Sequence, residues 1–409
     1  MQIQQLADAA QQAMQTGRLD EAARLWERVL AAAPDHPQAL FHLGQHAVYR
    51  NEPRKALDLL QRAAKAAPRE PGILLHTSFV YRSLGDTASE LAILDRAISV
   101  DPFFLPALLA KGAALDRTGQ KRQAARVFRD ALAIAPPDEN LPPEIRATTA
   151  RARQVVQENA GELETYLDSA LRDLPRPEKS IRFEEAKAAL IGTKKVYQQQ
   201  PTMLHYPRLP AIPFYERADF PWIGTVEAAT DTIRTELETL LEQQKAEFRP
   251  YLANPQGNQI EYAAQWNAYF FWSDGKRLDD HCARCPKTAA LLETLPLADV
   301  PGAAPTAFFS ALEPKAGIPA HTGVTNTRLI VHLPLIVPGD CWFRVGNETR
   351  EWRLGEALIF DDTMEHEAWN GSDRLRVLLI FDIWNPHLDQ AEQQLVRTLM
   401  SAYQDYHKI

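Results

Sequence analysis

The chain has 409 residues, of which 45% are hydrophobic and 24% are charged, and its formal net charge is −8. This length predicts two or three domains, and this composition is typical of a soluble globular protein. The negative net charge disfavours nucleic acid as the main partner, because binding phosphates requires clustered lysine and arginine.

No apolar run is long enough to cross a bilayer, and the stretch MQIQQLADAAQQAMQ lacks the basic start and apolar core of a secretory signal. We therefore expect no membrane span and a cytoplasmic location. The cysteines, Cys282, Cys285 and Cys341, are too few for a disulfide framework in so long a chain. Cys282 and Cys285 form one C-x-x-C pair, which cannot supply four zinc ligands. We interpret both as plain thiols and leave open whether they pair.

The first third of the chain contains an internal repeat of 34 residues, with a turn residue between two helical stretches and a proline after the second. The turn residues are Gly17, Asn51, Gly85 and Gly119, and the prolines are Pro34, Pro68, Pro102 and Pro136. Small residues recur where the helices of a unit would cross closely, at Ala22, Ala56 and Ala124. Glu90 takes this place in the third unit, which we therefore expect to pack less tightly.

This period and these columns resemble the tetratricopeptide repeat, in four repeats over roughly residues 3–137, with GRLDEAARLWERVLAAAPDHPQAL as the clearest copy. The resemblance implies an all-α solenoid for residues 1–137. A stack of helix pairs forms a curved surface that often holds a peptide or a partner protein. Support of the next domain and self-association agree equally well with the pattern, and the oligomeric state stays open.

Residues 138–202 keep a helical pattern without a chemical motif, and we interpret them as a helical connector. A segment rich in proline and aromatic residues then begins the next domain, which we place at residues 203–409. One amphipathic helix is predicted over residues 226–248. Further on, short apolar runs such as NAYFFW, TAFFSAL, RLIVHLPLIV and LRVLLIFDIW predict strands. Several runs are apolar on both faces, which favours a double-sheet jelly roll.

Polar residues on these apolar strands are informative, because a buried imidazole or guanidinium needs a partner. Arg328 and His332 lie four residues apart and therefore share one face of a strand. Arg376 shares a face with Asp382 on the last strand in the same way. These side chains point either into the interior of the jelly roll or to solvent.

Two histidines lie at the ends of predicted strands. His321 just precedes one strand and His366 just follows another, so both could reach the mouth of a jelly roll, where non-haem iron is commonly held. Either histidine alone is more often structural than metal-binding. Together with their surroundings, the two make a metal site the hypothesis to test.

Several motifs occur in order in the C-terminal half: HTGVTNTRLIVHLPL, W-x-x-G-x-x-x-x-FDD-x-x-x-HEAWN and R-x-x-x-x-FDIWNP. With the upstream segments YPRLPAIPFYERADFPW and PKTAALLETLP, they resemble the aspartyl/asparaginyl β-hydroxylases over roughly residues 203–388. The resemblance implies a double-stranded β-helix (jelly-roll) catalytic domain with flanking helices. It also implies an oxygenase that depends on iron(II), 2-oxoglutarate and O₂. A tetratricopeptide array precedes this domain in some members of the family.

The iron-ligating histidines of the family correspond to His321 and His366. The position two residues after the first histidine carries a carboxylate ligand in most enzymes of this chemistry, and here it is Gly323. This difference is itself typical of the family, in which water takes the place of the carboxylate. Asp361 and Asp362 are nearby groups that we expect to orient His366.

The same motifs imply the residues that bind cosubstrate and substrate. Arg376 and Ser310 correspond to the residues that bind the far carboxylate of 2-oxoglutarate. His332 corresponds to the residue that binds the carboxylate next to the iron. Arg328 corresponds to an arginine that holds the acidic or amide side chain of the substrate.

Two basic residues of the family are absent from this chain. Ile330 stands where a basic residue assists the cosubstrate, and Phe308 stands where a lysine assists the substrate. Substrate identity is therefore the least transferable property. We predict hydroxylation of an aspartyl or asparaginyl residue in a protein or peptide, with the repeats as a docking surface. The alternatives are the same chemistry on a free amino acid, a peptide natural product or a lipid-linked acyl group, and a repeat scaffold without turnover.

Overall fold

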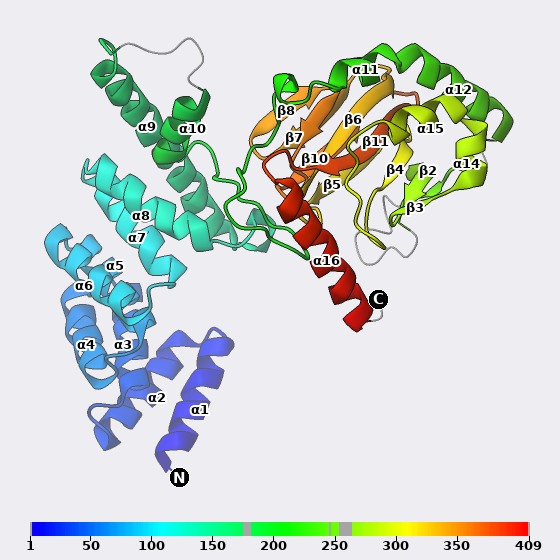
Figure 1. The fold of residues 1–409 in the computed structure, drawn as a ribbon. Coiled ribbons are helices and arrows are strands. Elements are labelled where there is room, and N and C mark those ends of the chain that lie inside the picture. Colours follow the sequence, from blue (N-terminus) through cyan, green and yellow to red (C-terminus); the bar gives the residue numbers. More distant parts are fainter. Residues whose placement is uncertain (1, 175–180, 245–246, 253–263, 408–409) are drawn as a thin grey trace. The chain divides into compact units, whose positions relative to one another are not determined.

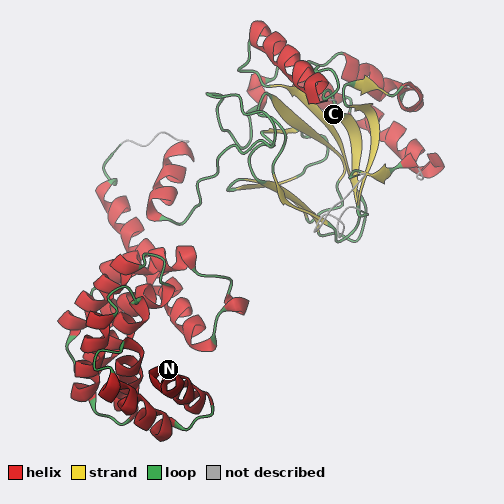
Figure 2. Cartoon of the chain, turned by 90° about the horizontal axis from the view of Figure 1, so that it is seen from below, coloured by secondary structure: helices red, strands yellow, loops and turns green. Residues whose placement is uncertain are grey.

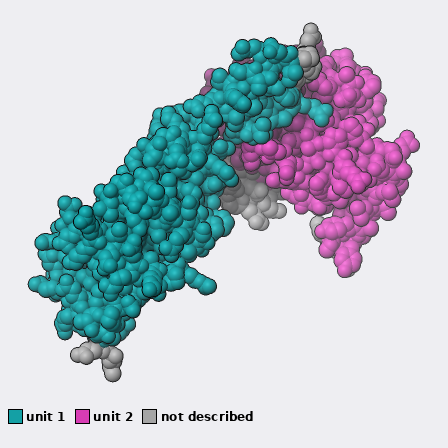
Figure 3. All heavy atoms as spheres, turned by 90° about the vertical axis from the view of Figure 1, so that its left-hand side faces the viewer, with its two compact units in different colours: residues 1–193 teal, residues 194–409 magenta. Residues whose placement is uncertain are grey.

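The chain folds into two compact units. The computed structural model describes residues 2–174, 181–244, 247–252 and 264–407 (Figure 1). Contacts between Cα atoms divide the chain into residues 1–193 and residues 194–409 (Figure 3). The first unit is built of helices, and the second contains the two β-sheets of the described chain (Figure 2).

Four pairs of helices form the N-terminal part of the first unit. They are α1 (Gln2–Gln15), α2 (Leu19–Ala32), α3 (Pro37–Tyr49), α4 (Pro53–Ala66), α5 (Pro71–Ser83), α6 (Thr87–Val100), α7 (Leu105–Arg117) and α8 (Lys121–Ile134). The turn residues Gly17, Asn51, Gly85 and Gly119 have φ angles between 60° and 76°. Glycine and asparagine adopt this left-handed conformation more readily than other residues, which explains why these types recur every 34 residues.

Glu90 has a partner in the following repeat. Its side chain is buried, and its carboxylate accepts a hydrogen bond of 2.6 Å from Arg117 Nη2 on α7. Ala22, Ala56 and Ala124 are buried at the equivalent places of the other pairs. An ion pair between the third and fourth repeats thus compensates for the small residue that the third repeat lacks, because a buried carboxylate with a cationic partner is not left uncompensated.

Two further helices complete the first unit. They are α9 (Pro143–Ala170) and α10 (Ile181–Ile191), and a short 3₁₀ turn, η1 (Asp138–Asn140), precedes them. Ala152 and Val155 of α9 pack against Leu108 and Phe128 of the last repeat, so this helix extends the apolar core of the repeats. None of the described helices combines the length and the apolar character needed to cross a bilayer.

The second unit contains two antiparallel sheets. The large sheet has the order β1-β2-β4-β11-β6-β9, with β3 beside β2, and the small sheet has the order β5-β10-β7-β8. The large sheet consists of β1 (Arg249–Pro250), β2 (Trp266–Ser273), β3 (Lys276–Arg277), β4 (Ala307–Leu312), β6 (Arg328–Ile336), β9 (Leu358–Phe360) and β11 (Arg376–Trp384). The small sheet consists of β5 (Gly317–His321), β7 (Cys341–Val345), β8 (Glu348–Glu351) and β10 (His366–Asn370).

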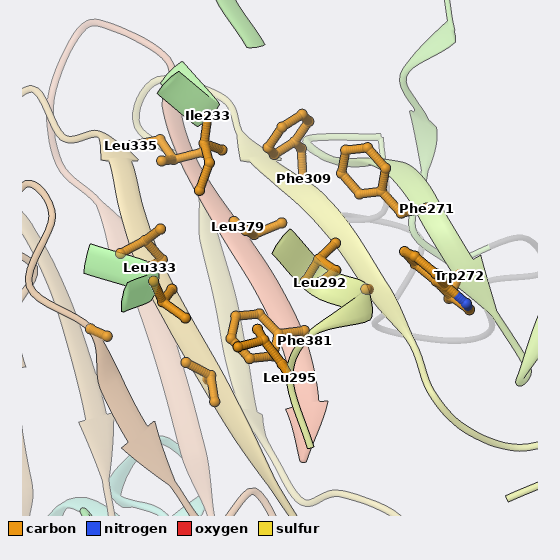
Figure 4. Packing of buried hydrophobic residues seen from close by; sticks show 14 of the residues in the cluster. Ile233, Phe271, Trp272, Leu292, Leu295, Phe309, Leu333, Leu335, Leu379 and Phe381 are labelled. Atoms are coloured by element: carbon orange, nitrogen blue, oxygen red, sulfur yellow. The ribbon is translucent and has the colours of Figure 1, made fainter. Parts of the chain in front are cut away.

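Helices cover the outer face of the large sheet (Figure 1). The helices of this unit are η2 (Arg217–Asp219), α11 (Ile223–Ala228), α12 (Thr230–Gln244), α14 (Asp279–Arg284), α15 (Pro286–Glu293) and the C-terminal α16 (Gln390–His407). Ile233 of α12 and Leu292 of α15 belong to the same apolar core as Phe309, Leu333 and Leu379 of the sheet (Figure 4). The expected amphipathic helix is present as α11 and α12.

Strand β6 shows how the large sheet presents two different faces. Leu329, Val331 and Leu333 lie in the core beneath the helices. Arg328 and His332 lie on the opposite face, because successive side chains of a strand point to opposite sides. The sequence predicts this alternation correctly, and it directs the polar side chains of β6 toward the small sheet.

A second apolar cluster fills the space between the two sheets. Phe308 and Ile380 of the large sheet and Phe343 and Ala368 of the small sheet belong to it. The longer apolar runs of the sequence are strands, as predicted. The sequence does not predict β5, β8 or β10, because these strands are short and carry more polar or conformationally special residues.

Candidate active site

All six residues that the motifs single out line one cavity of about 400 Å³. Ser310, Arg328, His332 and Arg376 come from the inner face of the large sheet, and His321 and His366 come from the small sheet. The cavity therefore lies between the sheets, where the two inner faces meet.

His321 and His366 are direct partners across two neighbouring strands. His321 is the last residue of β5 and His366 is the first residue of β10, and the two Cα positions are paired in the antiparallel register. Their ring centroids are 4.1 Å apart. The expectation that His321 precedes a strand and His366 follows one is wrong, because β5 and β10 are themselves the strands that carry the two rings.

Backbone carbonyl groups orient both imidazole rings. His321 Nδ1 lies 2.8 Å from the carbonyl oxygen of Pro319, and His366 Nδ1 lies 3.0 Å from that of Met364. A carbonyl oxygen only accepts, so each Nδ1 carries the proton and each Nε2 keeps a lone pair. The carbonyl group of Met364 is thus the partner of His366 Nδ1, and the main chain of Asp362 also interacts with this imidazole.

Both histidines are held in the neutral form that binds a metal. Burial and, to a smaller extent, the neighbouring His321 lower the pKa of His366 to about 3. Desolvation in the cavity also lowers the pKa of His321, although this residue lies at the rim and is exposed. Two neutral imidazoles with free Nε2 atoms suit iron(II). Within the described ranges no group of three or more His, Cys, Asp or Glu side chains is arranged around a metal position.

A carboxyl group from another loop occupies the space beside Gly323. A Cβ atom at Gly323 would overlap the carboxylate of Asp362, and Gly323 N donates to the carbonyl oxygen of Asp362 at 2.6 Å. A side chain at residue 323 is therefore excluded. Burial raises the pKa of Asp362 to about 7, although the charge of Arg328 opposes this shift, and Asp362 Oδ1 has no hydrogen-bond partner.

Asp361 faces away from the cavity. Its carboxylate accepts hydrogen bonds from Gln199 Nε2 at 2.5 Å and from Thr363 Oγ1 at 2.6 Å. Gln199 belongs to the segment that follows the first unit, and its amide oxygen accepts from Asn326 Nδ2 at 3.1 Å. Asp361 therefore anchors this segment to the second unit, contrary to the expectation that it orients His366.

Arg376 is a buried cation with an incomplete set of partners. Its side chain is almost inaccessible, and within the described part of the chain its Nε and Nη1 atoms have no hydrogen-bond partner. The guanidinium carbon lies 4.7 Å from the ring centre of Trp352. Burial lowers the pKa of Arg376 to about 9, so the group is still charged at neutral pH. A planar cation with two free donors is suited to a carboxylate.

Ser310 and His332 lie on the same face of the large sheet, opposite two residues of β11 that are two positions apart. Ser310 is opposite Leu378 on β11, and its Oγ accepts a hydrogen bond of 3.1 Å from Trp266 Nε1, which leaves the hydroxyl hydrogen free to donate. His332 is opposite Ile380, and its Nδ1 has no partner. Burial lowers the pKa of His332 well below its ordinary value, and the charge of Arg376 adds to this effect.

Arg328 differs from Arg376 because it has an acidic partner. Its Nη1 lies 2.5 Å from Asp382 Oδ2, and Asp382 Oδ1 accepts a hydrogen bond of 2.9 Å from Thr306 N. Burial lowers the pKa of Arg328, but the charges of Asp382 and Asp362 outweigh it and hold the pKa above its ordinary value. None of the described residues offers a hydrogen-bond partner to Arg328 Nε.

Sequence reasoning missed several residues that shape the cavity. Trp266 and Trp352 contact Ser310 and Arg376, although tryptophans on such strands are usually core residues. Tyr251 stacks on Trp266, with ring centroids 4.0 Å apart. Only the alternation of β2, which places Trp266 and Ala268 on one face, could have indicated the contact with Ser310.

Comparison with known proteins agrees with this site. Residues 227–386 match the family described as aspartyl/asparaginyl beta-hydroxylase, and residues 7–71 and 43–103 match the tetratricopeptide repeat. Residues 227–386 are thus similar to the aspartyl/asparaginyl beta-hydroxylase family, and a tetratricopeptide repeat region precedes them.

Three relatives show how far the similarity extends. The human aspartyl/asparaginyl beta-hydroxylase is 25% identical over 418 residues, which cover 95% of this chain and 54% of the human protein. The ornithine lipid ester-linked acyl 2-hydroxylase of Rhizobium tropici is 36% identical over 186 residues, 45% of this chain and 64% of the relative. The human aspartate beta-hydroxylase domain-containing protein 2 is 32% identical over 202 residues, 48% of this chain and 53% of the relative. The chain thus spans between half and two thirds of the length of these relatives.

Proposed function

We propose that the chain is an iron(II)- and 2-oxoglutarate-dependent hydroxylase whose second unit has the double-stranded β-helix (jelly-roll) architecture. One observation carries the proposal: two neutral histidines, paired across β5 and β10, share a cavity with a buried cation that lacks a carboxylate partner. A repeat scaffold without turnover would gain nothing from keeping Arg376 buried and incompletely bonded, since such a group is costly to bury.

The residues of the chain then have distinct roles. His321 and His366 would hold the iron through their Nε2 atoms, and the carbonyl groups of Pro319 and Met364 keep these atoms directed away from the backbone. Iron, 2-oxoglutarate and O₂ supply the oxidising power when bound: one oxygen atom enters the C–H bond, and the other enters succinate as CO₂ is lost. Asp362 lies in the space that Gly323 leaves open.

Arg376 and Ser310 bind and orient the cosubstrate. The two free donors of the guanidinium and the hydroxyl hydrogen of Ser310 bind the far carboxylate of 2-oxoglutarate. His332 lines the same cavity and would bind the near carboxylate. Trp352 covers one face of the guanidinium, which fixes its plane and excludes water from it.

The substrate is the less constrained part of the proposal. The family favours an aspartyl or asparaginyl residue of a protein or peptide, docked by the repeats of residues 1–137, with Arg328 as the group that holds it. A lipid-linked acyl group is the second candidate. It is supported by the acyl 2-hydroxylase of Rhizobium tropici and by the apolar side chains of Phe308 and Ile330 in the cavity.

The conversion of 2-oxoglutarate to succinate by the purified full chain with iron(II) tests the proposal. We expect His366→Ala to lose bound iron and turnover together. His387→Ala is the matched control, because His387 is exposed and lies outside the cavity. A wild-type protein that binds neither iron nor 2-oxoglutarate would refute the proposed function.

A further inference from the structure

The end of the cavity around Arg328 carries more acidic than basic groups. Arg328 and Arg376 are the only lysine or arginine residues among the described residues that line the cavity. Arg376 and Asp382 are six positions apart on β11 (382 − 376 = 6), or roughly 20 Å along a strand, so Arg376 does not reach the Arg328 end. The Arg328 end thus contains one guanidinium and two buried carboxyl groups, those of Asp362 and Asp382.

Asp382 neutralises the only cation at this end. Its side chain is 1% exposed, compared with 15% for Arg328, and the two form an ion pair at 2.5 Å. Thr306 N holds the other carboxylate oxygen, so Asp382 cannot turn away when a ligand enters. A substrate carboxylate would have to share Arg328 with Asp382 in a site of low dielectric, where like charges repel strongly.

An uncharged carbonyl group is not repelled by the carboxylate of Asp382. Arg328 Nε is buried and has no hydrogen-bond partner among the residues that the structure describes, so it can donate to a carbonyl oxygen while Nη1 stays on Asp382. The rest of this end is apolar: Tyr251, Phe308, Ile330 and Ile380 line it. Tyr251 stacks on Phe308, with ring centroids 5.1 Å apart and ring planes inclined by 30°, and the two rings form a continuous apolar wall.

We propose that the cavity accepts an aliphatic acyl group in ester or amide linkage and excludes free carboxylates, and that Asp382 sets this preference by neutralising Arg328. The inference rests on the proposed hydroxylase function and selects the second of its substrate candidates, the acyl group, over an aspartyl residue. The acyl carbonyl accepts from Arg328 Nε, and the chain lies along Tyr251, Phe308 and Ile330. The hydroxylation itself consumes O₂ and 2-oxoglutarate and releases succinate and CO₂, so it requires no further oxidant.

Calorimetric binding to the iron-free full chain with 2-oxoglutarate present tests the charge preference without turnover. The probes are methyl octanoate, N-methyl octanamide and octanoate, which share one chain and differ in charge, together with an asparaginyl and an aspartyl peptide of otherwise identical sequence. We expect the ester or the amide to bind at least tenfold more tightly than octanoate. We expect the same order in the succinate assay with iron(II).

Two variants test the role of Asp382. Asp382→Asn keeps an acceptor for Thr306 N but removes the charge, and should reduce the preference for ester over acid at least tenfold. Phe308→Lys adds a cation to the same end without touching the ion pair, and should shift the preference in the same direction. A preference that neither variant changes, while 2-oxoglutarate still binds, overturns the role of Asp382.

The outcomes separate this inference from the proposed function. Binding of 2-oxoglutarate together with tighter binding of octanoate or of the aspartyl peptide overturns the inference alone. Tighter binding of the asparaginyl peptide than of both neutral octanoyl probes overturns the aliphatic part and assigns the site to a peptide. Failure to bind 2-oxoglutarate overturns both.

Discussion

The two ends of the cavity each contain an arginine on the same face of the large sheet, but the partners of the two guanidinium groups differ. Arg376 lies against the ring of Trp352 and has two free donors, whereas Arg328 is paired with Asp382. Burial lowers the pKa of Arg376 to about 9, but the carboxylates beside Arg328 raise its pKa. A buried cation without a counterion is poised for an anionic ligand, whereas a neutralised one can only select by hydrogen bonding and shape.

The largest expected effect comes from removing the unpaired cation. We expect Arg376→Met to raise the KM for 2-oxoglutarate about 100-fold, because losing one partner of a desolvated charge pair costs about 3 kcal/mol. The melting temperature should not fall, since an apolar side chain replaces a charge without a partner. Succinate assays and thermal unfolding measure the two effects. Arg353→Met, at an exposed position, is the control. A marked loss of stability in Arg376→Met would contradict the proposed difference between an unpaired Arg376 and a paired Arg328.

Removing the paired cation should have the opposite pattern. We expect Arg328→Met to lower the free energy of unfolding by about 3 kcal/mol, because it leaves the carboxylate of Asp382 buried and unpaired. The KM for 2-oxoglutarate should change little. Urea denaturation measures the stability, and the double variant Arg328→Met/Asp382→Leu should recover most of the loss. If the single variant were as stable as the wild type, the burial of the Asp382 carboxylate would not depend on its ion pair with Arg328.

A smaller effect is expected from removing the aromatic ring that lies against Arg376. Replacing Trp352 by leucine removes a cation–π contact that contributes about 1–2 kcal/mol when desolvated, so the KM for 2-oxoglutarate should rise roughly tenfold. Binding of neutral acyl probes near Arg328 should be unaffected. Trp342→Leu, outside the cavity, serves as the comparison. Equal losses of 2-oxoglutarate and acyl-probe binding would indicate general unfolding of the site.

The smallest expected difference lies in the dependence on pH. A guanidinium with a pKa of about 9 loses its proton as pH rises through that value, so binding of 2-oxoglutarate should weaken above pH 9. At pH 9.5 the loss should be roughly fourfold, as follows from the fraction that stays protonated. Binding of neutral acyl probes should not change over this range, because the pKa of Arg328 is raised. A parallel decline of both ligands would show that the two arginines titrate alike.

Local sequence determined much of the fold. The 34-residue period and the turn residues with left-handed backbone predict the helix pairs, because each unit repeats the same local requirements. The alternation in β6 predicts that Arg328 and His332 lie opposite the apolar core, because side chains alternate along a strand. The motif around His321 and His366 also indicates the family and the residues to examine.

What local patterns leave open is the choice of partner between distant segments. The pairing of His321 with His366 depends on the register of β5 and β10, two short strands without a strong apolar pattern. The carboxyl group of Asp362 explains Gly323 only because the two backbones approach closely in space.

The same holds for the two arginines. On the sequence alone, Arg328 and Arg376 are both cations on strands with apolar neighbours, and Asp382 appears to belong with Arg376 because it shares a strand face with it. The tertiary structure assigns Asp382 to Arg328 across the strands β6 and β11 and leaves Arg376 to Trp352. Sequence periodicity thus determined which side chains enter the cavity. Strand pairing decided which of them neutralise one another, because that depends on distances between residues far apart in the chain.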